Sequence, residues 1–169
     1  MILTMKGKGL QHEIGKRHPF KSEEQEVYLN LARTQSILSA QFSRLFRAHG
    51  LSDATYNTLR ILRGAGDAGR TCGEIREMLV TEVPDVTRLV DRLVKEGMAT
   101  RARGSADRRV VKVVISKKGL DRLAELDAPV MELHERQLGH LSAEKLRTLS
   151  ALLEAARTGD GPVSGCSGA

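Results

Sequence analysis

Two clusters of charged and polar residues have side chains suited to contacting nucleic acid. The first lies in the segment VPDVTRLVDRL, and the second lies in the segment GSADRR. Arginine presents a planar fork of donors that fits phosphate oxygens and the guanine edge, and threonine and carboxylates also contact base edges. The candidate residues are Pro84, Asp85, Thr87, Arg88 and Arg92 in the first cluster, and Asp107, Arg108 and Arg109 in the second.

A helix is predicted to carry the first cluster. Pro84 suits a first helical position, where its missing N–H group costs nothing, and Asp85 favours the positive end of a helix. The helix is expected to run to Glu96 and to stop at Gly97. One side is apolar, which leaves other sides free for a ligand. The residues on the apolar side are Val86, Leu89, Val90 and Leu93.

A shorter helix is predicted just before this one. The sequence from Thr71 to Glu74 is a capping-box pattern, in which the threonine oxygen and the glutamate carboxylate satisfy free amide groups at a helix start. Ile75, Met78 and Leu79 form its expected inward face. Two helices joined by a brief turn form a helix-turn-helix, whose second helix is shaped to enter the major groove of DNA.

A β-hairpin is predicted to carry the second cluster. Residues 98–103 and 110–115 have the pattern of two strands, and residues 104–109 join them in a basic turn. Arginines at a hairpin tip can enter a narrow minor groove, where negative potential is focused. The order of helices and hairpin predicts a mostly α winged helix-turn-helix, with the DNA-binding domain at residues 50–116.

Amphipathic helices are predicted on both sides of this domain. Their apolar stripes need partners, and one short chain cannot easily bury all of them itself. We therefore expect residues 20–48 and 117–157 to be helical regions whose apolar stripes need a partner, for which another protomer is one candidate. Residues 1–19 are expected to be a mobile extension, and the Gly/Ser-rich residues 158–169 a disordered tail.

Three serines stand where helix caps are expected. Ser52, Ser116 and Ser142 each precede a stretch with helical periodicity. Pro129 lies inside the stretch that follows Ser116, so a kink or break is predicted there.

Composition and charge favour a polyanion-binding protein over a membrane protein or an enzyme. The chain has 169 residues, 40% apolar, and carries a net charge of +6 with a pI near 9.6. A basic chain favours a polyanionic partner, although charge alone also fits a merely basic protein. No apolar stretch approaches a membrane span, so we expect a cytoplasmic protein with no membrane partner. No enzyme motif and no cofactor-binding motif is found.

Cysteine and histidine usage points away from metal binding. Cys72 and Cys166 have no paired spacing, and the histidines are scattered, so no metal site is predicted. A thiol at a helix start gains thiolate character, which makes Cys72 a candidate for oxidant sensing. The alternative is a partly buried thiol without a redox role, and we favour it for Cys72.

Three segments in order are similar to those of a known family. LSDATYNTLRIL, VPDVTRLVDRLVKEGMATR and DRRVVKVVISKKG resemble successive signatures of MarR-type regulators, which are winged helix-turn-helix transcription factors. The resemblance covers roughly residues 20 to 157, within the accuracy of sequence-based boundaries.

The resemblance implies roles for the candidate residues. Arg109 would reach the minor groove, Asp107 would help to hold the wing arginines, and Arg108 would add a second charge. The alternative for Arg109 is a solvated hairpin charge. Near the start of the implied recognition helix, the candidate base or phosphate contacts are Asp85, Thr87 and Arg88.

Two arginines of the helix have structural alternatives. Arg88 would lose its DNA role if it formed a salt bridge with Asp91 or Asp85. Arg92 is open to pairing within the fold instead of contacting DNA.

The resemblance also implies partners. It predicts a homodimer built from the terminal helices, with residues 20–48 and 117–157 as the helical dimerisation region. It also predicts an imperfect palindrome as the operator, because a twofold axis relates the two winged helices. It further implies repression of a nearby promoter, relieved by a small effector that is often aromatic or acidic. No ligand-binding residue can be assigned from the resemblance.

Two other functions fit a basic winged helix. It could be a protein-interaction module that binds an acidic partner, and would then discriminate little between DNA sequences. It could also be a sequence-nonspecific architectural protein, for which charge suffices.

Overall fold

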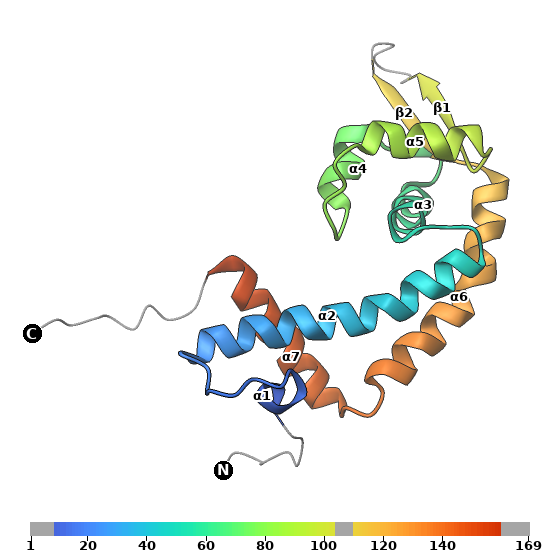
Figure 1. Cartoon of the computed structure of the whole chain (residues 1–169). Coiled ribbons are helices and arrows are strands. Elements are labelled where there is room, and N and C mark those ends of the chain that lie inside the picture. Colours follow the sequence, from blue (N-terminus) through green and yellow to red (C-terminus); the bar gives the residue numbers. More distant parts are fainter. Residues whose placement is uncertain (1–8, 104–109, 160–169) are drawn as a thin grey trace, which may run out of the picture. The chain divides into compact units, whose positions relative to one another are not determined.

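The computed structural model describes residues 9–103 and 110–159. The chain divides into two compact units, residues 1–125 and residues 126–169. The first unit contains helices α1 to α5 and a β-hairpin, and the second contains helix α7 (Figure 1). Helix α6, Lys117–Leu138, begins in the first unit and ends in the second. No helix of the described residues is long and apolar enough to cross a membrane.

The long helix α2 spans Glu23–Ala48, within the predicted helical region at residues 20–48. Its N-cap is Ser22, whose side chain accepts a hydrogen bond from the Gln25 amide at 3.3 Å. A short helix α1, Leu10–Glu13, lies within residues 1–19, whose mobility stays a prediction. Leu10 is buried, and the Glu13 carboxylate accepts a hydrogen bond from Arg33 on α2.

The helix α3 spans Asp53–Ala65, followed by the 3-10 turn η1 at Gly66–Ala68. Ser52 caps α3 as predicted, and Thr55 completes a capping box. The predicted box at Thr71 and Glu74 likewise starts α4, Cys72–Met78. Ile75 is buried as expected, but Met78 is half exposed, because it ends a helix of only seven residues.

The helix α5 spans Val86–Lys95, and its start differs from the prediction. Asp85 is the N-cap, and its carboxylate accepts a hydrogen bond from the Arg88 amide at 2.8 Å. Pro84 therefore precedes the cap instead of occupying the first helical position. The physical reason is that the aspartate side chain satisfies a free amide that proline cannot. The helix ends at Lys95, one residue before the predicted Glu96, which is its C-cap, and Gly97 follows with a φ of +72°.

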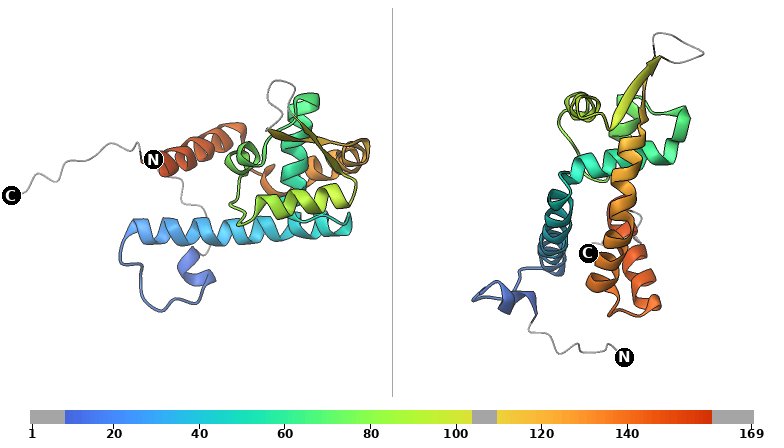
Figure 2. Two further views of the ribbon diagram at one scale, coloured as in Figure 1. Left: turned by 90° about the horizontal axis from the view of Figure 1, so that it is seen from above. Right: turned by 90° about the vertical axis from the view of Figure 1, so that its right-hand side faces the viewer.

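The two predicted strands form an antiparallel hairpin. Strand β1 is Ala99–Arg103 and strand β2 is Val111–Ile115, with Arg101 opposite Val113. Arg70, just before α4, adds an isolated bridge to Val113. In the right-hand view of Figure 2 the hairpin projects beyond the helices of its own unit.

The core of the first unit confirms the winged helix-turn-helix. It joins α3, α4, α5, β2 and the start of α6, so every element of the motif contributes to one apolar centre. The fully buried apolar residues in this unit are Leu59, Leu62, Ile75, Val86, Val90, Leu93, Val113 and Leu123.

The helix α6 passes through Pro129 without a break, so that half of the prediction is wrong, and the kink stays a prediction. A proline removes one backbone donor and crowds the preceding turn, but the hydrogen bonds of the neighbouring turns can maintain a helix of 22 residues. The predicted cap at Ser116 is present, since its hydroxyl accepts a hydrogen bond from the Gly119 amide at 3.1 Å. Helix α7 spans Ala143–Thr158 and has Ser142 as its predicted N-cap.

Candidate nucleic-acid interface

The helix α5 buries one side and exposes the other. The fully buried residues on it are Val86, Val90 and Leu93. Polar side chains on the opposite side are exposed, so a ligand can reach them without any rearrangement of the core. These exposed residues are Thr87, Arg88, Asp91, Arg92 and Lys95.

The Arg88 side chain has no ion-pair partner among the residues that the structure describes. Both carboxylates that could have paired with it have other roles. Asp85 caps the helix through the Arg88 backbone amide, and Asp91 pairs with Arg101, with 2.6 Å between Oδ1 and Nη2. The guanidinium of Arg88 is therefore exposed and available to an anionic ligand.

Arg92 is placed differently from Arg88. Its Nε lies 2.9 Å from Oε1 of Glu96, one turn further along α5. This is the pairing within the fold that the sequence left open. Because the pair is exposed, it contributes little to stability and can give way to a phosphate.

The ion pair between Asp91 and Arg101 joins the helix to the wing. Arg101 lies in the middle of β1, so the pair links α5 directly to the strand that leads into the hairpin turn. The sequence analysis missed Arg101, because no local pattern relates a helical residue to a strand residue ten positions later. It is a tertiary contact that only the fold reveals.

The predicted wing residues Asp107, Arg108 and Arg109 lie outside the described residues. Their roles therefore remain predictions. The structure places the strands on either side of them, and these strands carry the basic residues Arg101 and Lys112.

The capping box of α4 changes the pKa of its glutamate. Hydrogen bonds from the backbone and side chain of Thr71 lower the pKa of Glu74, and Arg70 and Lys112 add to the effect.

The capping box also places Cys72 at the first position of α4, where its side chain is half-buried. Cys166 lies outside the described residues. Within the described ranges, no group of three or more His, Cys, Asp or Glu side chains is arranged to hold a metal ion.

Comparison with known proteins decides the family. The model of the MarR family matches residues 49–110. A crystal structure of a MarR transcription factor from Planctomyces limnophilus is 42% identical, covers 80% of this chain and 98% of its own, and superposes with a TM-score of 0.60. The chain belongs to the MarR family. It is therefore a DNA-binding transcriptional regulator and not an enzyme.

Two further proteins are similar to the chain. The transcriptional repressor IacR from Pseudomonas putida is 25% identical over 147 residues, which are 87% of this chain and 86% of the relative. The MepR–DNA complex from S. aureus shares the fold, with a TM-score of 0.70, 19% identity, and coverage of 78% of this chain and 97% of its own.

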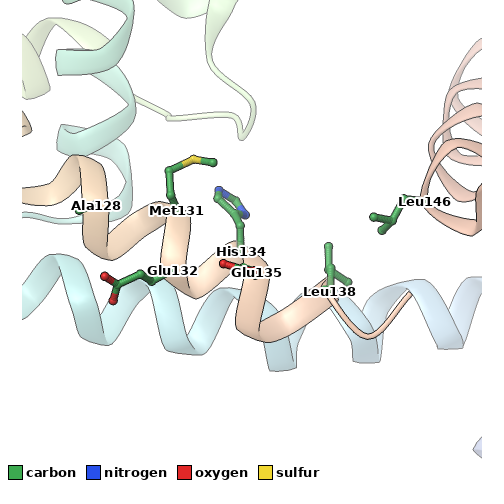
Figure 3. A pocket seen from close by; sticks show the side chains of 8 residues that line it. Ala128, Met131, Glu132, His134, Glu135, Leu138 and Leu146 are labelled. Carbon is green, nitrogen blue, oxygen red and sulfur yellow. The ribbon is translucent and has the colours of Figure 1, made fainter. Parts of the chain in front are cut away.

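The second unit of this MarR protein has an open apolar groove. The groove has a volume of about 580 Å³, and Figure 3 shows Met131, His134 and Leu138 of α6 on the same side of it, with Leu146 of α7 opposite. Met131 is 66% exposed, although it is apolar. The lining is completed by Ala128, Glu132, Glu135 and Gly139.

Proposed function

We propose that the chain is a sequence-specific, dimeric repressor that acts in the cytoplasm. It reads the major groove with α5 and the minor groove with the tip of the hairpin. The observation that carries the proposal is the exposed guanidinium of Arg88, which has no ion-pair partner in the described part of the chain, on a helix joined to the wing by an ion pair.

The residues of α5 divide into readers and supports. Arg88 and Thr87 are exposed near the N-terminal end of the helix, the end that contacts base edges in helix-turn-helix proteins. Asp85 positions that end through its capping bond, and Pro84 fixes the approach of the chain to the cap. Arg92 contributes a phosphate contact once its pair with Glu96 opens.

The wing supplies the second contact with DNA. Arg109 enters the minor groove, Arg108 adds charge beside it, and Asp107 orients the two arginines. The ion pair of Arg101 with Asp91 supports this role, because it fixes the base of the hairpin against α5.

Exposed apolar surface supports the homodimer. On α2, Val27 and Tyr28 are 54% and 69% exposed, and on α7 Leu152 is 63% exposed. All of α7 is described, and none of its residues is buried in the single chain. Apolar surface of this kind marks an interaction site, and here the occupant is a second copy of the chain. Two winged helices would then read half-sites about one helical turn apart.

Repression and its relief by an effector are part of the proposal. IacR is named a repressor, and we assign the same direction of regulation here. A small aromatic or acidic effector would release the protein from DNA by changing the spacing of the two winged helices. Cys72 is half-buried, which favours a thiol without a redox role over an oxidant sensor.

Selection from a random duplex library tests the proposal. The wild type should enrich an imperfect palindrome with half-sites about 10 bp apart. Arg109→Ala should recover a weaker motif, with the loss at the positions under the wing. Arg44→Ala, an exposed arginine of α2, is the matched control and should recover the wild-type motif.

Two outcomes would favour other functions. DNA binding without any enriched motif would indicate an architectural protein, for which charge suffices. An absence of DNA binding would indicate a module that binds an acidic protein.

A further inference from the structure

The end of α5 is joined to the start of α6 by an unusual set of hydrogen bonds. Lys118 donates from Nζ to the carbonyl oxygen of Glu96 at 2.8 Å. The hydroxyl of Ser116 donates to the carbonyl of Gly97 at 2.7 Å, and the Ser116 amide donates to the carbonyl of Met98 at 3.0 Å. We call residues 96–98 and 116–119 the α5–α6 junction.

Close packing accompanies these bonds. Gly119 lies so near the start of β1 and the end of β2 that a Cβ atom on it would collide with the carbonyl oxygen of Met98 and would lie 2.8 Å from Cγ1 of Ile115. The stem of Lys118 passes along Gly97, 4.0 Å from the position that a Cβ would take there. The junction therefore combines hydrogen bonds with a steric fit that few other side chains would permit.

The hydrogen bonds at the junction come from different donors than those at an ordinary helix end. The last carbonyls of a helix are usually satisfied by water or by the residues that directly follow. In α5 the following residues already form such a cap, since the amides of Gly97 and Met98 donate to Val94 and Leu93. Lys118 and Ser116 come from about twenty residues further along the chain, so their bonds fix α5 against another helix.

The junction is one of three points that fix α5. Asp85 caps its N-terminal end, and the pair of Asp91 with Arg101 ties its middle to β1. The junction fixes the C-terminal end to α6, a helix that begins in the first unit and ends in the second. Thr87 and Arg88 lie near the opposite end of the same helix as the junction, α5.

We propose that Lys118 and Ser116 are positioning residues, which fix the angle of α5 against α6 and thereby set the discrimination between DNA sequences. This inference rests on the proposed function. Lys118 acts through the Glu96 carbonyl, so its loss lowers the preference for the correct sequence more than it lowers general affinity for DNA.

Lys117 provides a matched control for Lys118. It is the neighbouring residue and carries the same charge, but its side chain is 87% exposed and pairs with Asp121 of its own helix. Lys117→Met and Lys118→Met therefore remove the same charge from adjacent positions. Only Lys118→Met removes a bond to α5, and Lys118→Arg retains a donor that can reach the carbonyl.

The test measures the preference for one duplex over another by fluorescence anisotropy. The duplexes are the best one that the wild type selects from a random library and a scrambled version of it. Lys118→Met should lower the preference about fivefold, the size of one net hydrogen bond, and Ser116→Ala should act in the same direction. Lys117→Met should change the preference less than about twofold, and Lys118→Arg should restore most of it.

Two results would overturn the inference. The first is an equal loss of preference in Lys118→Met and Lys117→Met. The second is an equal loss of affinity for both duplexes in Lys118→Met alone, since this would make Lys118 a phosphate contact. Thermal unfolding of each variant separates these results from a general loss of stability, which would lower the melting temperature without changing the preference.

Amide hydrogen exchange tests the junction without DNA. Residues 94–103 should exchange faster in Lys118→Met than in Lys117→Met. A wild type that binds both duplexes equally contradicts the proposed function and not the junction. Equal exchange in the two variants overturns the junction itself.

Discussion

Substitution of Arg88 tests whether α5 contacts bases or only provides positive charge for the phosphates. A good base contact contributes roughly 1 to 3 kcal/mol of discrimination. Arg88→Ala should therefore relax the choice of base at one position of each half-site by about that amount. Binding to single-base variants of the selected duplex measures it.

Arg92→Ala is the internal comparison for this prediction. Arg92 lies on the same helix but is paired with Glu96, so its removal should weaken binding to all duplexes by a similar, smaller factor. A uniform loss in Arg88→Ala would show that Arg88 contacts phosphate and not a base.

At Gly119 the structure leaves no room for a side chain. Gly119→Ala should destabilise the protein by about 1 to 3 kcal/mol, because the added methyl group collides with the Met98 carbonyl. Gly64→Ala is the contrasting variant, since Gly64 lies in α3 with open space around it. It should leave stability unchanged or raise it by up to about 1 kcal/mol. Chemical denaturation compares the two, and equal stabilities would contradict the packing described at Gly119.

At the scale of elements, short sequence patterns predicted the helix caps correctly, because a cap depends on interactions between neighbouring residues. Ser52, Thr71, Ser116 and Ser142 cap helices as expected, because a cap is set by a few neighbouring residues. Pro84 was misplaced because a competing cap at Asp85 satisfies the backbone better.

Contacts between elements could not be predicted in this way. The bonds of Arg101 to Asp91 and of Lys118 to Glu96 join residues that no short pattern relates. The face of α5 was therefore predictable from periodicity, whereas the contacts that fix its direction required the fold.

The helix α4 carries a pH-dependent contribution to stability. The folded-state pKa of Glu74 is lowered by the bonds from Thr71, so the carboxylate form stabilises the fold. This contribution is present above the ordinary carboxyl pKa and is lost as the pH falls through the lowered value. Urea unfolding over a series of acidic pH values should show the loss in the wild type.

Glu74→Gln should flatten this pH dependence. Glutamine retains the capping geometry but does not titrate in this range. Glu77→Gln, on the same helix, is the control and should keep the wild-type pH profile. An unchanged profile in Glu74→Gln would contradict a role for the capping carboxylate.

At the scale of the whole molecule, we propose that the apolar groove of the second unit is part of the dimer interface. Met131→Asp places a charge in this groove and should shift the protein towards monomer in sedimentation velocity experiments, because burial of an unpaired charge is costly. Val80→Asp makes the same kind of change at a residue that is 89% exposed in the first unit, and it should leave the sedimentation unchanged. A dimer that persists in Met131→Asp at low concentration would exclude the groove from the interface.

Because the net charge is +6, the ionic strength must be controlled in any test of sequence-specific DNA binding. Charge alone gives binding to any DNA, and this binding weakens steeply with salt. Sequence-specific contacts by α5 and the wing are what should remain at physiological salt. The same measurement must therefore compare two duplexes under that condition.

The most direct test is the ratio of wild-type affinities for the selected and scrambled duplexes at near-physiological salt. We predict a preference of about 10³-fold or more, the lower end for specific regulators. Equal affinities for the two duplexes would contradict sequence-specific recognition by this chain.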